Sequence, residues 1–84
     1  MTRRRAEPSS SLPLFARNFR LAQARAGLNN REVAQSLGVS ESQVNKWRRG
    51  DVVPRFERVV EIAQLFELTT DWFADDHTEE PVTA

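Results

Sequence analysis

Two helix starts lie so close together in residues 29–50 that they restrict how this chain can fold. Asn29 and Glu32 have the spacing of a capping box, in which a polar side chain begins a helix and a carboxylate three residues later binds back to it. Ser40 and Gln43 repeat the pattern. Each start is followed by apolar residues at helical spacing and then by a glycine that ends the segment. Because only the three residues 38–40 join the two segments, the sequence predicts a pair of short, crossing helices, a helix-turn-helix.

Helical patterns also flank this pair. An apolar stripe at intervals of three and four runs through residues 12–26, and another runs through residues 56–66 after Pro54. Thr69 or Thr70 can cap a short last helix. The sequence therefore predicts an all-α fold, a compact domain of five helices with the helix-turn-helix at helices 2 and 3, and no strand.

The predicted domain covers residues 12–74. Residues 1–11 are polar and include three consecutive arginines, so we expect a flexible basic arm there. Residues 75–84 are acidic and contain a proline, which predicts a disordered acidic tail. His77, the only histidine of the chain, is expected to be solvated in that tail.

Most of the large apolar residues are expected to form one hydrophobic core, since an aromatic stripe at helical spacing is typical of a core. The predicted core residues are Phe15, Phe19, Val33, Leu37, Val44, Trp47, Phe56, Val59, Ile62, Phe66 and Phe73. Val60, Leu65 and Trp72 do not fit on the same face. They are either partly buried under the last helix or exposed as a dimer surface.

The charge of the chain is zero in sum but strongly divided along the sequence. Residues 1–58 hold all 12 basic side chains and only five acidic ones, a net charge of +7. Residues 59–84 hold seven acidic side chains and no basic one, a net charge of −7. A neutral total would argue against a nucleic-acid partner, whereas a basic N-terminal part is typical of one.

Other classes of protein are excluded by what the sequence lacks. There is no cysteine, so disulfides, thiolate metal sites and thiol chemistry are ruled out, which suits a cytoplasmic protein. No clustered metal ligands, phosphate-binding glycine loop or catalytic triad is present, so we expect no enzyme activity, no metal and no cofactor. No apolar run approaches the ~20 residues that span a bilayer, so no membrane partner is expected.

The segment Asn30–Arg49, which reads NREVAQSLGVSESQVNKWRR, resembles the helix-turn-helix of the phage repressor/Cro type, also called the XRE family. Small Ala34 stands where the helices of that family cross, and Gly38 stands in its turn. The likeness continues through Pro54 and the segment 68–73, so it covers roughly residues 14–74. This resemblance implies a sequence-specific regulator of transcription that binds double-stranded DNA, most simply a repressor.

The resemblance also implies which residues contact DNA. The second motif helix, about residues 41–49, enters the major groove, where each base pair shows a distinct pattern of donors and acceptors. The family's base-contacting positions correspond to Glu41, Ser42 and Lys46, with Gln43 and Asn45 as neighbours. Lys46 can donate to guanine, Gln43 or Asn45 can pair with adenine, and Glu41 can accept from cytosine. Glu41 can equally well serve only to stabilise the helix dipole.

Phosphate contacts follow from the same resemblance. Asn29 and Asn30 place a helix N-terminus against the DNA backbone, although Asn29 also serves as a cap, and Arg49 and Arg55 reach flanking phosphates. Arg31 is expected on a solvated face. The arm residues Arg3, Arg4 and Arg5 either enter a minor groove or only solubilise the chain.

Two departures from the family pattern bear on these contacts. Many members pair an arginine on helix 1 with a glutamate at the end of the recognition helix, and those positions correspond here to Gln23 and Arg48. Either Arg48 hydrogen-bonds to Gln23 or it is released to bind phosphate. Asp51 replaces the basic residues that some relatives carry in the next loop, which argues against a strong phosphate clamp there.

The implied partners are operator DNA, palindromic in sequence, and a second copy of the chain, because a homodimer sets two recognition helices ~34 Å apart on successive major grooves. The expected setting is the cytoplasm of a bacterium, with the protein, bacterial or phage-encoded, on the nucleoid. An alternative is an antitoxin-like interaction module whose acidic C-terminal part binds another protein.

Overall fold

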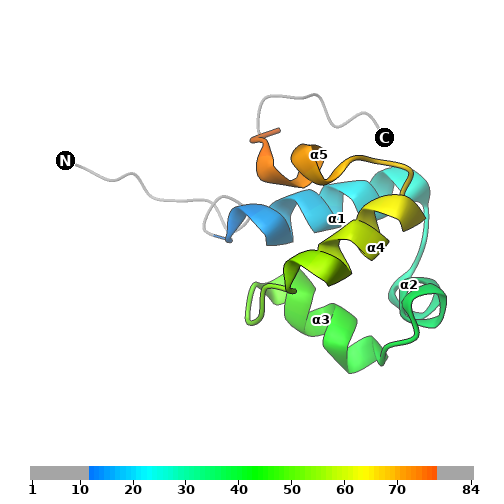
Figure 1. The fold of residues 1–84 in the computed structure, drawn as a ribbon. Helices are drawn as coiled ribbons and strands as arrows, with labels where there is room; N and C mark the ends of the chain where they lie inside the picture. The colour runs from blue at the N-terminus through cyan, green and yellow to red at the C-terminus, as the bar shows by residue number, and fades with distance from the viewer. Residues whose placement is uncertain (1–11, 78–84) are drawn as a thin grey trace.

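The computed structural model describes residues 12–77, and within them the chain forms five helices and no strand (Figure 1). The predicted all-α fold is therefore confirmed, whereas the predicted arm and most of the predicted tail lie outside the described residues. The helices are α1 (Leu14–Ala26), α2 (Asn30–Leu37), α3 (Glu41–Arg49), α4 (Phe56–Leu65) and α5 (Thr70–Ala74).

The caps that the sequence predicted for α2 and α3 are formed. The Asn29 side chain accepts from the Glu32 amide at 2.8 Å, and the Glu32 carboxylate accepts from the Asn29 amide at 2.8 Å. Ser40 Oγ accepts from the Gln43 amide at 3.0 Å. These bonds satisfy amide groups that a helix N-terminus leaves without partners, which is why two short helices can begin only eleven residues apart.

The last two helices are joined without a glycine. Thr69 caps α5, its hydroxyl accepting from the Trp72 amide at 3.2 Å. At the end of α4 the amide of Leu68 donates to the carbonyl of Ala63 at 2.8 Å, a bond that requires a left-handed residue between the helix and Leu68. Glu67 takes that conformation, with φ of 60°. A side chain is therefore held in a region that normally favours glycine.

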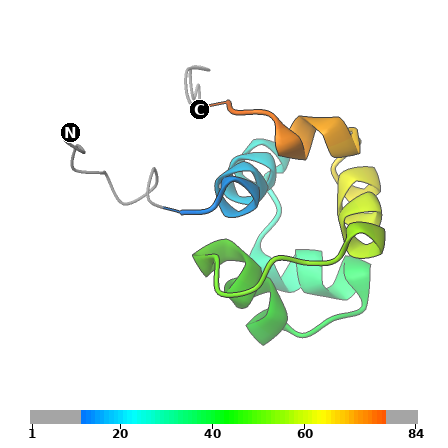
Figure 2. The ribbon, with the colours of Figure 1, turned by 60° about the vertical axis from the view of Figure 1, so that its left-hand side comes forward.

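Phe19 of α1 lies fully buried at the centre of the core. Its ring meets the edge of Trp47 of α3 at 5.9 Å between centroids and that of Phe66 at 6.0 Å, the geometry that aromatic pairs prefer. Helix α1 thus carries the residue around which the other helices pack. Figure 2 shows α1 nearly end-on with the remaining helices arranged around one side of it.

One predicted core residue is exposed. Phe56 was expected inside because it shares a helical face with Ile62, but 67% of its surface is exposed. The buried residues of α4, Ile62 and Ala63, lie in its second half, so the first turn extends beyond the core. Periodicity predicted the correct face of the helix but not where the core ends. Val60, Leu65 and Trp72 are half-buried, which confirms the partial burial that the sequence allowed for them.

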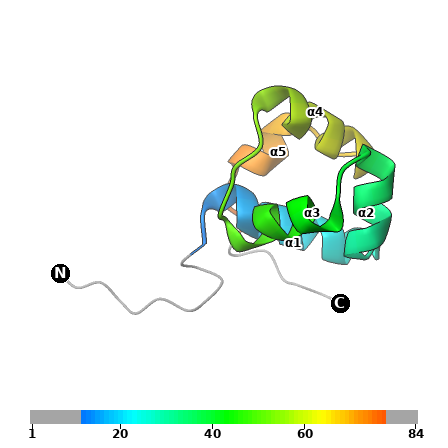
Figure 3. The same ribbon diagram turned by 90° about the horizontal axis from the view of Figure 1, so that it is seen from below.

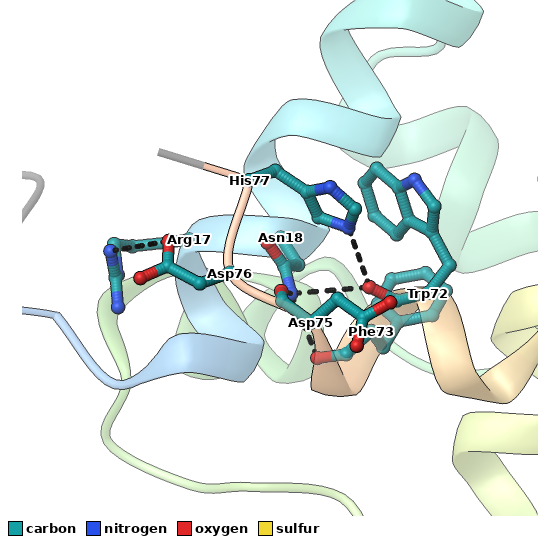
Figure 4. A network of polar contacts seen from close by, with 7 residues as sticks. All are labelled: Arg17, Asn18, Trp72, Phe73, Asp75, Asp76 and His77. Atoms are coloured by element: carbon teal, nitrogen blue, oxygen red, sulfur yellow. Dashed lines mark hydrogen bonds and ion pairs between the residues drawn. The ribbon is translucent and has the colours of Figure 1, made fainter. Parts of the chain in front are cut away.

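The C-terminal segment 75–77 contacts α1 and Trp72, although Asp75 and Asp76 remain exposed (Figure 4). Asn18, only 2% exposed, donates from Nδ2 to the carbonyls of Phe73 and Asp75, both at 2.8 Å. His77 stacks on Trp72 with 4.1 Å between ring centroids, and its Nε2 donates to the Trp72 carbonyl at 2.7 Å. The prediction of a solvated His77 was therefore wrong, because nothing in a local pattern reveals that Asn18 needs acceptors from the end of α5.

Candidate nucleic-acid interface

Helix α3 presents one polar face to solvent. Val44 and Trp47 are buried against the core, whereas Ser42, Lys46 and Arg49, which share a row at spacings of four and three, are exposed. Figure 3 shows α3 on the outer side of α1, with its length open to view. The face is therefore available along about two turns of helix.

A second row on α3, formed by Glu41, Asn45 and Arg48, runs beside the first along the flank that faces α1 and α2. Glu41 is exposed in the first turn, where its carboxylate meets the positive end of the helix dipole. Asn45 and Arg48 are half-buried because they bind residues of α2 and α1. Gln43 is half-buried on the opposite flank, in an open groove of about 630 Å³ between α3 and the loop before α4.

The basic residues at the end of α3 differ in their surroundings. Among the described residues, Lys46 has no ion-pair partner, so its ammonium group is available to a ligand. Arg49 Nε lies 2.9 Å from the Asp51 carboxylate, and both side chains are more than half exposed. Such surface pairs contribute little and exchange readily, so Arg49 can still turn to a phosphate. Arg55, the residue before α4, is exposed.

A continuous chain of hydrogen bonds connects three helices behind this face. Arg48 Nη1 of α3 donates to Gln23 Oε1 of α1 at 2.8 Å. Gln23 Nε2 then donates to Asn30 Oδ1 of α2 at 2.7 Å, and Asn30 Nδ2 donates to Asn45 Oδ1 of α3 at 2.9 Å. The chain begins and ends on α3 and fixes its position against α1 and α2.

Of the two outcomes that the sequence left open for Arg48, the hydrogen bond to Gln23 is the one that forms. Arg20 adds a bond from its Nε to the Arg48 carbonyl at 2.9 Å. Burial and the nearby charge of Arg20 lower the pKa of Arg48, which nevertheless stays charged at neutral pH. Two arginines without a carboxylate between them make this corner of the molecule electropositive.

That corner opens into a groove of about 710 Å³ between α1 and the start of α2. Its wall includes Arg20, Arg31 and Arg48 together with Asn29 and Asn30 at the N-terminus of α2, against one carboxylate, that of Glu41. Helix N-termini attract anions, and three guanidinium groups strengthen that attraction. Asn30 directs its side chain inward to Gln23 and Asn45, a role that the sequence did not predict and that only the crossing of the helices creates.

The predicted arm residues Arg3, Arg4 and Arg5 lie outside the described residues, but the point to which they are tethered is defined. Pro13 packs against Gly50, so closely that a Cβ atom on Gly50 would lie 2.6 Å from Pro13 Cδ. The described chain therefore begins beside the C-terminal end of α3.

Arg58 was not singled out by the sequence, yet it contributes to the same half of the molecule. Its Nη1 donates to the Leu37 carbonyl at 3.2 Å and to the Glu61 carboxylate at 2.6 Å, so it joins α4 to the end of α2. No group of three potential metal ligands occurs in residues 12–77. None of the helices in that range has the length and apolar character needed to cross a membrane.

Comparison with known proteins supports the same interpretation of α2 and α3. A family model described as helix-turn-helix matches residues 20–73. The fold is similar to the solution structure of the SOS-response transcriptional repressor LexA from Eubacterium rectale, with a TM-score of 0.73 and 24% sequence identity over 95% of this chain and 82% of that one. No curated protein sequence matches the chain.

Proposed function

The chain belongs to the helix-turn-helix family of DNA-binding transcription regulators, of the phage repressor/Cro type, and from this premise we propose that it represses transcription by inserting α3 into the major groove of a specific operator. The observation that carries the proposal is the exposed row Ser42, Lys46 and Arg49, which lies on a helix narrow enough for that groove. A domain that occupies an operator represses by blocking access of the polymerase.

We assign the base contacts to Ser42, Lys46 and Asn45, with Glu41 and Gln43 at the edges of the contact. Lys46 is fully available and donates best to guanine O6 and N7. Glu41 at the start of α3 can accept from cytosine N4. Gln43 lies half-buried on the far flank, so it reaches a base only if its side chain extends out of the groove beside the loop.

Phosphate contacts are assigned to the N-terminus of α2 and to the arginines that border α3. Asn29 and Asn30 lie at that N-terminus, in the groove that Arg48 also lines. Arg49 and Arg55 flank the other end of the recognition helix. We propose that Arg48 acts mainly by holding α3 in place, since its guanidinium group binds Gln23, and that it adds positive potential for a nearby phosphate.

The arm is proposed to add minor-groove contacts beyond the end of α3. The support is its tether, since Pro13 packs on Gly50 at the end of the recognition helix. Removing residues 1–11 should reduce the slope of log affinity against log salt by about three, one for each arginine. A slope that does not change would assign Arg3, Arg4 and Arg5 to solubility alone.

A homodimer on DNA is proposed from an apolar patch next to α3. Val52, Val53 and Phe56 are 42%, 59% and 67% exposed, and they follow directly on the recognition helix. A second copy that covers this patch would bring two α3 helices to the same side of the assembly, as a palindromic operator requires. Phe56→Ser should abolish cooperative binding to a two-half-site duplex and leave binding to one half-site intact. If the variant bound the two-half-site duplex with the same affinity and cooperativity as the unaltered protein, the proposed surface would be wrong.

Selection of bound duplexes from a random pool, at 0.15 M salt, tests the main proposal. We expect one enriched motif, and recovery of no motif above nonspecific level would refute sequence-specific binding. On the selected operator, Lys46→Ala should change the preferred base at one position. Arg55→Ala should weaken all sequences alike and reduce the salt slope by about one.

Arg25→Ala is the matched control for both variants. It removes the same charge from the C-terminal end of α1, where the guanidinium group lies 5.9 Å above the Trp72 ring and away from α3. Its affinity and base preference should be those of the unaltered protein. If Lys46→Ala and Arg55→Ala behaved alike, the division into base and phosphate contacts would be wrong.

A further inference from the structure

We propose that the chain of hydrogen bonds from Arg48 through Gln23 and Asn30 fixes the amide of Asn45 in one orientation, so that Asn45 meets DNA only as a hydrogen-bond donor. The inference rests on the proposed function, because it requires α3 to face bases. It makes Gln23 and Asn30, which touch no base, positioning residues for sequence preference. The sequence allowed Asn45 to pair with adenine by donating and accepting at once. An amide held in one orientation can only donate.

The direction of the chain follows from its first member. An arginine can only donate, so the atom of Gln23 that faces Arg48 must be its oxygen, at 2.8 Å. The Gln23 nitrogen must then face Asn30, and it donates to Asn30 Oδ1 at 2.7 Å. The Asn30 nitrogen in turn donates to Asn45 Oδ1 at 2.9 Å. Each amide orientation is thus determined by the one before it.

Reversing one amide would place like atoms against each other. Gln23 is only 4% exposed, so water cannot replace a partner lost there. If Gln23 turned over, its nitrogen would face Arg48 and its oxygen would face Asn30 Oδ1, and two hydrogen bonds would be lost at once. Leaving a buried polar group without a partner typically costs about 1–3 kcal/mol. The energy of the whole chain therefore maintains the orientation of Asn45.

The free end of the chain is accessible to a ligand. Asn45 Oδ1 is occupied by Asn30, and in the described part of the chain Asn45 Nδ2 has no protein acceptor and is not among the buried atoms that lack a partner. Asn45 lies three residues after Ser42, so the two side chains are neighbours on the surface of α3, beside the exposed row. An outward amino group favours guanine and thymine, whose keto oxygens accept in the major groove, over cytosine, which offers only its amino donor there.

Asn30→Asp provides a sharp test because it reverses only the last link. One carboxylate oxygen at position 30 can still accept from Gln23 Nε2, but the other now faces Asn45, which must turn its nitrogen inward. The oxygen of Asn45 then points outward and selects amino bases, cytosine or adenine. The variant should fold, because a carboxylate in the first turn of α2 is favoured by the helix dipole and every member of the chain keeps a partner.

The experiment is duplex selection with the unaltered protein and with Asn45→Ala, Asn30→Asp and the double variant. Asn45→Ala identifies the base position that Asn45 contacts, by the loss of preference there. At that position we expect Asn30→Asp to change the preference from guanine or thymine toward cytosine, by roughly tenfold in relative affinity, whereas adenine, which offers both an acceptor and a donor there, discriminates least. The double variant should match Asn45→Ala, since the effect of position 30 acts through Asn45.

Asn29→Asp is the matched control for charge. It adds the same negative charge one residue earlier and retains the cap to the Glu32 amide, but it does not touch the chain. Both aspartate variants should weaken binding to all duplexes, and only Asn30→Asp should change a base preference. An unchanged preference in Asn30→Asp, in a variant that still selects an operator, would overturn the inference. If the unaltered protein selects no operator, the proposed function fails instead.

Discussion

The contact between Gly50 and Pro13 joins the end of α3 to the start of α1, and how tightly the two are packed can be measured by a double-mutant cycle. Gly50 ends α3 with φ of 80°, and Gly38 ends α2 with φ of 71°. The surroundings of the two glycines differ: a Cβ atom on Gly50 would lie 2.6 Å from Pro13 Cδ, whereas one on Gly38 would meet nothing within 4 Å. Gly38→Ala is therefore a control for the backbone alone.

The magnitudes follow from these two geometries. Holding an alanine in the left-handed region costs about 1–2 kcal/mol, and the stiffer unfolded chain returns about 0.4–1 kcal/mol. Gly38→Ala should thus lower the free energy of unfolding by about 1 kcal/mol. Gly50→Ala has the same backbone cost and also displaces the proline ring, and such overpacking typically costs about 1–3 kcal/mol. Its total should be about 2–4 kcal/mol.

Urea unfolding followed by the fluorescence of Trp47 and Trp72 measures both losses. Pro13→Ala removes the ring atoms that a methyl group at position 50 would strike. Gly50→Ala should lose more stability than Gly38→Ala, and combining it with Pro13→Ala should remove most of that difference. The expected coupling energy between the two substitutions is about 1–2 kcal/mol. Equal losses at the two glycines, or a coupling below about 0.5 kcal/mol, would refute the argument that the recognition helix is packed closely against the start of α1.

Three further predictions concern the contacts and the backbone of the C-terminal segment. Asn18→Ala should destabilise the fold by about 2–3 kcal/mol, measured by urea unfolding, because the carbonyls of Phe73 and Asp75 lose their donor; a loss below about 0.5 kcal/mol would contradict this role. Glu67→Gly should raise the free energy of unfolding by about 0.5–1 kcal/mol, and with it the melting temperature, because glycine adopts φ of 60° without strain. A lower melting temperature would contradict that reason. Ending the chain after residue 74 should lower the melting temperature by several degrees, whereas ending it after residue 77 should not, because only the first change removes the contacts of 75–77 with α1 and Trp72.

The helices could be predicted from the sequence because their signals are local. The cap of α2 joins Asn29 to Glu32, and the cap of α3 joins Ser40 to Gln43, each across three residues that are visible together in the sequence. The end of α4 could not be predicted in this way. Its left-handed residue is Glu67 rather than glycine, so the tertiary packing of the following residues holds the turn against its intrinsic preference.

Long-range polar contacts were the part that the sequence could not reveal. Asn18 binds the Asp75 carbonyl across 57 residues, and no composition or period connects two such positions. The sequence left open whether Arg48 binds Gln23 or a phosphate. The family pattern shows that the two residues lie close together, but not which hydrogen bond forms. Continuation of that bond to Asn30 and Asn45 depends on how three helices cross, which side-chain spacing alone does not determine.

The fold also resolves how a chain of zero net charge can bind a polyanion. Helix α1 lies between α3 and α5, and these two helices do not contact each other (Figure 1). A helix with its side chains is about 10 Å wide, more than the ~8 Å over which charges act at physiological salt. Asp71, the one acid of α5, is therefore screened from the DNA that we propose at α3, where Lys46, Arg48 and Arg49 lie in the last turn. Its influence should emerge only at low salt, where the screening length exceeds the width of the molecule. We therefore expect the local field of α3, and not the sum of charges, to determine its affinity for phosphate.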